Sequence, residues 1–137
     1  MKLLIIGGGV YVKGSDYNEN GTIIPSVLES IRDNLIDQVG FVTTSNKSVN
    51  DCLKKSKKLS KFLNIKIKSN TFLKFESKSK DSYLKALKKF KPDATIVATP
   101  DHTHYKICKD VIFSNSNLLV VKPLSDTVKE VKSLLKM

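Results

Sequence analysis

Three consecutive glycines, Gly7-Gly8-Gly9, are the first residues in the sequence that could take part in chemistry. They directly follow the apolar run LLII at positions 3–6. A short apolar run without alternation, ended by glycine, predicts a strand buried on both faces. Because glycine has no side chain, a phosphate can approach the backbone N–H groups of such a turn closely. The glycines therefore predict a nucleotide-binding turn, and the alternative is a tight turn without a ligand.

Two later strands are also followed by residues that could act on a substrate. In DATIVATPDHTH an apolar strand ends at Thr99-Pro100, and His104 follows it; in LLVVKP another apolar strand is followed by Lys122. A histidine near a strand end can move a proton. The alternatives are a helix residue with local contacts for His104 and an ordinary surface lysine for Lys122.

The residues after the second predicted strand, 38–43, bear on the type of nucleotide. Sites that prefer NAD place an Asp or Glu there to bind the ribose hydroxyls. This chain has a polar run that includes Thr43, Ser45 and Lys47 but no carboxylate, and Asp37 lies at the other end of the strand. Small hydroxyls followed by a lysine can hold a 2′-phosphate, so the pattern favours NADP over NAD. A polar loop that only begins the next helix is the alternative.

The elements that must position these residues alternate between strand and helix along the whole chain. Strands are predicted at 3–6, 38–43, 94–98 and 118–121, with one bent strand or two short ones between 65 and 75. Helices are predicted at 22–35, 49–63, 80–90, 102–113 and 126–136. Five strands, each followed by a helix, predict an α/β fold: a Rossmann-like, three-layer, doubly wound parallel sheet forming a single domain.

The predicted helices are amphipathic, and several apolar residues near their ends are expected to face inward. These include Leu35, Phe62, Leu63, Leu84, Val128 and Leu135. Ser26 and Glu29 have the spacing of a capping box. The stretch 10–21 contains Gly14, Asn18 and Asn20 and has no helical period, so it is predicted to be irregular. The pyrophosphate of a nucleotide would then meet a loop first and helix amides second.

Composition narrows the class of protein. With 137 residues and 40% hydrophobic content, one globular domain is expected. No apolar stretch approaches the roughly 20 residues that span a bilayer, and the N-terminus lacks a signal-peptide pattern, so we expect a cytoplasmic protein without membrane contact. Cys52 and Cys108 are predicted to be buried thiols. No metal-ligand spacing is present, so no metal is expected.

The net charge of +11 is almost entirely due to lysine, since Arg32 is the single arginine. Recognition of nucleic acids favours arginine for its bidentate geometry. The lysines therefore predict a solvated surface rather than a nucleic-acid-binding one, and their positive field would attract an anionic cofactor or substrate. Binding of a polyanion is the weaker alternative.

Taken together, these motifs resemble those of a known family. A strand that ends in A-T-P, His104 four residues after Pro100, and a strand that ends in Lys122-Pro123 before a capped helix are similar to the glucose-fructose oxidoreductase/inositol dehydrogenase (Gfo/Idh/MocA-like) family. The resemblance covers essentially the whole chain, and only as the N-terminal nucleotide-binding domain of that family.

The resemblance implies an NAD(P)-binding Rossmann domain in which Gly7 and Gly9 hold the pyrophosphate. Thr99, Pro100 and His104 would line the nicotinamide side. Lys122 matches the lysine of the family's E-K-P motif, close to nicotinamide and substrate. In the complete enzyme a hydride would pass between nicotinamide and a sugar-like or cyclitol alcohol.

Three departures from the family pattern stand out. The third glycine of G-x-G-x-x-G would fall at Val12, and the motif glutamate is Val121. The chain also ends at Met137, before the family's C-terminal substrate domain. We therefore expect no turnover from this domain alone, exposed apolar surface at the last strand and helix, and self-association as a homo-oligomer. The alternative function is a non-catalytic Rossmann module that binds a nucleotide or docks another subunit.

Overall fold

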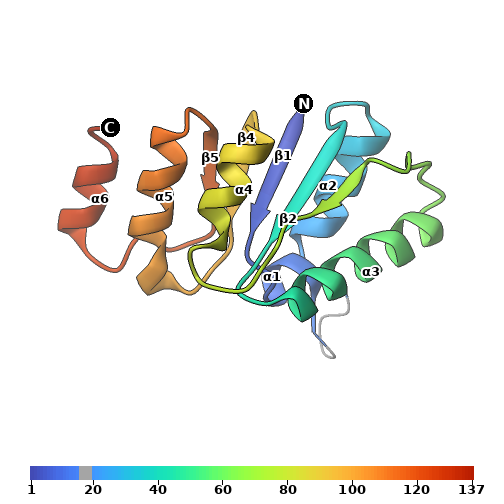
Figure 1. Cartoon of the computed structure of the whole chain (residues 1–137), viewed down its shortest axis with the longest axis horizontal. Coiled ribbons are helices and arrows are strands. Elements are labelled where there is room, and N and C mark those ends of the chain that lie inside the picture. The colour runs from blue at the N-terminus through green and yellow to red at the C-terminus, as the bar shows by residue number, and fades with distance from the viewer. Residues whose placement is uncertain (16–19) are drawn as a thin grey trace.

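The computed structural model describes residues 1–15 and 20–137. Its centre is a five-stranded parallel sheet in the order β3-β2-β1-β4-β5. The strands are β1 (Lys2–Ile6), β2 (Gln38–Val42), β3 (Phe72–Lys74), β4 (Ala94–Val97) and β5 (Asn117–Val120). β1 lies in the middle of the sheet, between β2 and β4 (Figure 1). The predicted doubly wound, Rossmann-like single domain is confirmed.

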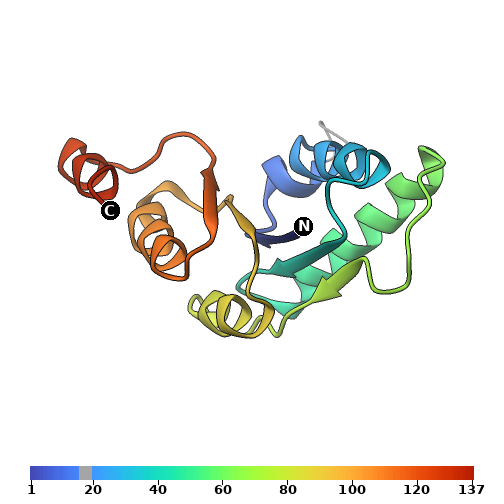
Figure 2. The same cartoon turned by 90° about the horizontal axis from the view of Figure 1, so that it is seen from above.

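Helices cover both faces of the sheet (Figure 2). α1 (Val10–Lys13), α2 (Ile23–Arg32) and α3 (Asn46–Phe62) pack on one face, and α4 (Ser82–Phe90) and α5 (His104–Phe113) pack on the other. β1 explains why both layers hold, because Leu3 and Ile5 point into the first core and Leu4 and Ile6 into the second. All four side chains are buried, so the run contributes to two cores at once.

The segment after the glycines differs from the prediction. Residues Val10–Lys13 form one helical turn, α1, where the stretch 10–21 was predicted to be irregular throughout. The side chain of Val12 is fully buried in the first core and anchors this turn. Gly14 ends it with a φ of 85° and donates its N–H to the carbonyl of Val10. Asn18, named in the predicted loop, lies outside the described residues.

The predicted capping box at the start of α2 is wrong. Thr22 is the residue that precedes the helix, and Ser26 lies one turn inside it. The hydroxyl of Ser26 donates to the carbonyl of Thr22 at 2.9 Å, and Glu29 forms an ion pair with Arg32. The sequence spacing alone could not distinguish this arrangement, because serine also bonds to a carbonyl four residues back within a helix.

Several apolar residues predicted to face inward are exposed. They are Leu35, Phe62, Leu63, Leu84, Val128 and Leu135. Most lie at or beyond the ends of their helices, where the chain leaves the core. α6 (Val128–Leu134) packs against α5 at one end of the molecule, beyond the sheet (Figure 1). Val128 and Leu135, together with the exposed Leu119 on the edge strand β5, give the apolar exposure expected at the last strand and helix.

β3 and α5, the helix predicted at 102–113, begin later than expected. β3 has only three residues, and Ile65 and Ile67 pack against the first core from outside any strand. A 3-10 turn at Asp101–Thr103 precedes α5, which starts at His104 rather than at His102. No helix among residues 1–15 and 20–137 is long and apolar enough to cross a bilayer.

Candidate functional site

The carboxyl ends of four strands are joined at one edge of the sheet. Three backbone hydrogen bonds connect them, from Gly7 N to Val42 O (2.9 Å), from Ala98 N to Ile6 O (2.9 Å) and from Val121 N to Val97 O (3.0 Å). Because all strands are parallel, the residues that follow them emerge at the same edge. A crevice at this edge of a doubly wound sheet is where ligands bind.

A cleft of about 700 Å³ lies at this edge. It is lined by the glycine turn Gly7–Gly9, by Thr43 after β2, by Thr99-Pro100 after β4 and by Lys122 after β5. The structure thus brings together residues from four segments that the sequence analysis identified separately. This volume is in the range of small-molecule and cofactor sites.

The three glycines have different reasons to be glycine. Gly7 has a φ of +119°, and a Cβ there would lie 2.0 Å from the carbonyl oxygen of Ala98. A Cβ at Gly8 would lie 2.4 Å from the hydroxyl of Ser48 on α3. A Cβ at Gly9 would meet nothing within 4 Å. The first two glycines therefore let the turn pack against its neighbours, while Gly9 leaves open space beside the cleft.

The prediction that a loop separates the glycines from the first helix amides is wrong, because α1 begins at the residue after Gly9.

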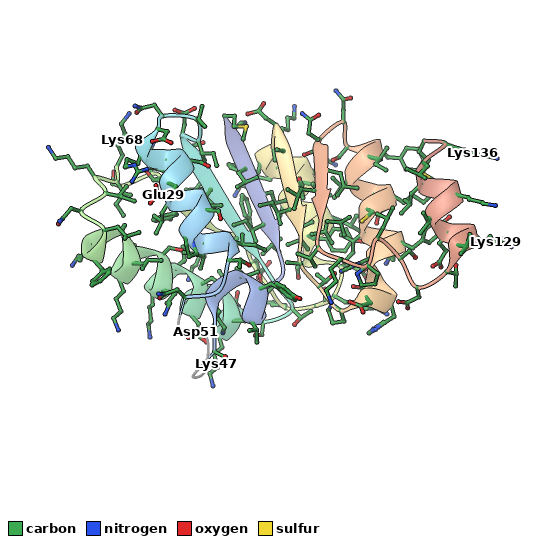
Figure 3. All side chains as sticks on the ribbon, turned by 180° about the vertical axis from the view of Figure 1, so that it is seen from behind. Glu29, Lys47, Asp51, Lys68, Lys129 and Lys136 are labelled. Atoms are coloured by element: carbon green, nitrogen blue, oxygen red, sulfur yellow. The ribbon has the colours of Figure 1, made fainter. Side chains whose placement is uncertain are left out.

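At the end of β2 the predicted residues divide into two groups. The hydroxyl of Thr43 donates to the carbonyl of Ser45 at 2.8 Å, and the hydroxyl of Ser45 accepts from the N–H of Ser48 and caps α3. Ser45 and Lys47 do not line the cleft, and Lys47 points away from the body of the molecule (Figure 3). Thr43 and the exposed Thr44 do line it. For Ser45 and Lys47, the alternative interpretation therefore holds: they belong to the polar segment that begins α3.

The wall of the cleft on the α4 and α5 side was not predicted. It includes Lys80, Asp81, Tyr83 and Lys106. The ammonium of Lys106 lies 2.6 Å from the carboxylate of Asp81, and this hydrogen bond lowers the pKa of Asp81. The hydroxyl of Tyr83 donates to Asp110 at 2.5 Å. Burial, followed by this hydrogen bond, raises the pKa of Tyr83 well above its usual value. One signal could have indicated part of this wall: because β3 is parallel to the other strands, the residues that follow it emerge at the same edge of the sheet.

His104 and Lys122 are placed differently from one another. The ring of His104 is fully buried and does not line the cleft; Nδ1 lies 2.7 Å from the carbonyl oxygen of Pro123 and Nε2 lies 2.8 Å from that of Thr99. His104 thereby ties the end of β4 to the turn after β5, which is the local-contact alternative. Lys122 is exposed, lines the cleft and has no ion pair with a described residue. His102 lines the cleft as well.

The cysteines are both free and buried, as predicted. Burial raises the pKa of the Cys52 and Cys108 thiols to about 11. Among residues 1–15 and 20–137, no group of three or more His, Cys, Asp or Glu is placed to hold a metal ion.

Comparison with known families bears on this site. The family model described as "Oxidoreductase family, NAD-binding Rossmann fold" (GFO_IDH_MocA) matches residues 1–137. The chain belongs to this Gfo/Idh/MocA oxidoreductase family. The match covers the family's NAD(P)-binding Rossmann domain, so the resemblance inferred from the sequence motifs is confirmed.

Solved structures show the same fold at low sequence identity. A dehydrogenase (MviM) from Clostridium difficile superimposes with a TM-score of 0.58 and 22% identity over 98% of this chain and 34% of that one. KijD10, a 3-ketoreductase from Actinomadura kijaniata in complex with NADP and TDP-benzene, superimposes with a TM-score of 0.65 and 13% identity over 99% of this chain and 33% of that one. The WlbA (WbpB) dehydrogenase from Thermus thermophilus, in complex with NAD and UDP-GlcNAcA, superimposes with a TM-score of 0.57 and 19% identity over 98% of this chain and 37% of that one.

The chain of this Gfo/Idh/MocA member spans about a third of the length of these solved relatives. A search of curated proteins found no match to its sequence.

Proposed function

We propose that this domain binds NADP(H) in the cleft and serves a protein that transfers a hydride between nicotinamide and a sugar-like or cyclitol alcohol. The observation that carries the proposal is the convergence of Gly7–Gly9, Thr99-Pro100 and Lys122 on one cleft at the carboxyl edge of the sheet. The substrate class is supported by a relative solved with UDP-GlcNAcA, a nucleotide sugar. This chain matches about a third of the length of the solved relatives, and we propose that the substrate site is completed by residues outside the matched part.

The residues of the cleft fit a dinucleotide. Open space at Gly9 gives room for the pyrophosphate next to the backbone. Thr99 and Pro100 would form the wall at the nicotinamide end, and the buried ring of His104 holds the Thr99 carbonyl in place. When bound, nicotinamide supplies or accepts the hydride. The ammonium of Lys122, with no acid paired to it among the described residues, would orient the substrate hydroxyl and stabilise negative charge on its oxygen.

The end of β2 supports the proposal of NADP over NAD. The residues there that line the cleft are Thr43 and Thr44, and neither carries a carboxylate to bind ribose hydroxyls. Asp37 lies at the opposite end of the strand, 2.6 Å from the N-terminal ammonium of Met1. Because the solved relatives include complexes with NAD and with NADP, the choice rests on this chain's own residues.

A titration with NADPH, followed by its fluorescence, tests the proposal. We expect binding in the micromolar range and its loss in Gly9→Asp, because the new carboxylate would occupy the pyrophosphate's space and repel it. Aspartate is also a favourable residue before a helix, so the variant should stay folded. Gly9→Asn adds the same bulk without charge and should bind more tightly than Gly9→Asp. Equal binding by wild type and Gly9→Asp would contradict the proposal.

A non-catalytic nucleotide-binding or subunit-docking module is the second candidate. It is favoured by Val121, which replaces the motif glutamate, and by the burial of His104 away from the cleft. Failure of the wild type to bind either NADH or NADPH would favour the docking form of this alternative.

A further inference from the structure

The loop between β3 and α4, residues 75–81, places a lysine at the cleft that the sequence analysis did not consider. Lys80 lines the cleft together with Thr44 from the end of β2. Lys47, the lysine predicted for this role, points outward instead (Figure 3). Of these two lysines, only Lys80, which follows β3, brings positive charge to the cleft.

Hydrogen bonds fix this loop against the end of β2. The backbone N–H of Thr43 donates to the hydroxyl of Ser77 at 3.0 Å, and the N–H of Ser77 donates to the side-chain oxygen of Asn46 at 3.0 Å. The hydroxyl of Ser82, the first residue of α4, accepts from two backbone N–H groups of the loop, those of Lys78 (3.1 Å) and Ser79 (3.0 Å). The backbone that carries Lys80 is thus held next to the strand end where the adenosine ribose of a dinucleotide binds.

The charges of the loop are paired in a way that leaves Lys80 available. Glu76 forms an ion pair with Lys78 at 2.5 Å, and Asp81 forms one with Lys106 at 2.6 Å. Lys80 makes no ion pair or hydrogen bond with the described residues, although its charge contributes to lowering the pKa of Asp81. Both acids of the loop are therefore engaged by other lysines, and the ammonium of Lys80 can approach a ligand.

We infer that Lys80 binds the 2′-phosphate of NADP and that Thr44 donates its hydroxyl to the same group. This inference rests on the proposed function. An ammonium on a flexible side chain is a suitable partner for a phosphate, since it acts as a point charge that needs no fixed geometry. The loop after β3, joined to the end of β2 through Ser77, would then set the preference for NADP where an acidic residue after β2 would select NAD.

The test compares the dissociation constants of NADPH and NADH, measured by fluorescence titration, for Lys80→Ala, Lys78→Ala and the wild type. We expect Lys80→Ala to weaken NADPH binding by about tenfold or more, the usual effect of losing a hydrogen bond between charged groups, with NADH unchanged. Lys78→Ala removes the same charge from the same loop, but Lys78 is engaged by Glu76 and does not line the cleft. Lys78→Ala should change the ratio of the NADPH and NADH dissociation constants by less than about twofold, through the screened surface field alone.

Each other outcome overturns the inference in a distinguishable way. An equal loss of NADPH and NADH binding in Lys80→Ala would assign the lysine to the pyrophosphate, which both coenzymes share. Equal NADPH/NADH ratios in the two lysine variants would mean that only the overall charge matters. Strong binding of both coenzymes with no effect of Lys80→Ala would refute the role of Lys80 and leave the proposed function intact. Failure of the wild type to bind either coenzyme would refute both.

Discussion

Replacing Gly7 with alanine should destabilise the domain far more than the same change at Gly9. At Gly7 the backbone has a φ of +119°, and the new Cβ would lie 2.0 Å from the Ala98 carbonyl oxygen, against about 3.4 Å for an ordinary contact. That carbonyl belongs to the residue whose N–H bonds to β1, so it cannot move without disturbing the pairing of β1 with β4. Backbone strain of about 1–3 kcal/mol and overpacking of about 1–3 kcal/mol give a loss near 4 kcal/mol.

This loss of unfolding free energy can be converted into a decrease in the melting temperature, Tm. A specific unfolding entropy of about 2.1 cal/mol/K per residue gives about 0.29 kcal/mol/K for this domain. Gly7→Ala should therefore lower Tm by about 14 °C in a thermal melt followed by circular dichroism. Gly9→Ala, whose Cβ meets nothing within 4 Å, should cost less than about 1 kcal/mol and lower Tm by no more than about 3 °C. Equal melting temperatures for the two variants would refute the close packing of the glycine turn against β4.

Two further predictions concern buried groups. His104→Ala removes a buried ring whose two nitrogens lie against the carbonyls of Thr99 and Pro123; it loses the hydrogen bond that the ring N–H donates to one of them and leaves a cavity. It should lower the free energy of unfolding in urea by about 3 kcal/mol; a change below about 1 kcal/mol would mean that the ring does not connect β4 to the turn after β5. Cys52 and Cys108, with pKa values raised to about 11 by burial, should react slowly with a disulfide reagent near pH 8 in the native protein and fast in denaturant; rapid labelling of the native protein would contradict their burial.

The central architecture could be predicted because it depends on short-range patterns. The run at 3–6 is apolar at every position, and a strand of that kind needs helices on both sides, which is how β1 lies between the two cores. Proline and glycine also marked strand ends correctly, as at Thr99-Pro100. Asn115, which follows α5, has a φ of 59°, the left-handed conformation that asparagine adopts after a helix more readily than most residues.

The errors arise where tertiary contacts override local patterns. One buried side chain, Val12, stabilises a helical turn in a stretch rich in turn residues, and no period of 3.6 could reveal a four-residue helix. Leu35 and Leu135 continue the apolar stripes of their helices in sequence. However, α2 ends at Arg32 and α6 at Leu134, so both leucines lie beyond the helix and are exposed. Stripe positions near helix ends are therefore poor guides to burial.

The candidate site was predictable where a motif and a strand end coincide. Gly7–Gly9, Thr99 and Lys122 follow apolar runs whose parallel arrangement places them together. Lys80 was not predictable in this way, because β3 is short and partly polar and its end could not be located in the sequence. His104 matched a motif, but its burial depends on a tertiary contact with the turn after β5.

The most direct measurement of the central claim is a titration of the ¹⁵N-labelled protein with NADPH, followed by amide chemical shifts. If one cleft holds the dinucleotide, the amides of Gly8, Gly9, Thr99 and Lys122 should shift together along a single saturating curve, with little change at the opposite edge of the sheet near Asp37. Shifts confined to one of these segments, separate curves for the glycine turn and for Lys122, or no shifts at all would contradict the shared cleft.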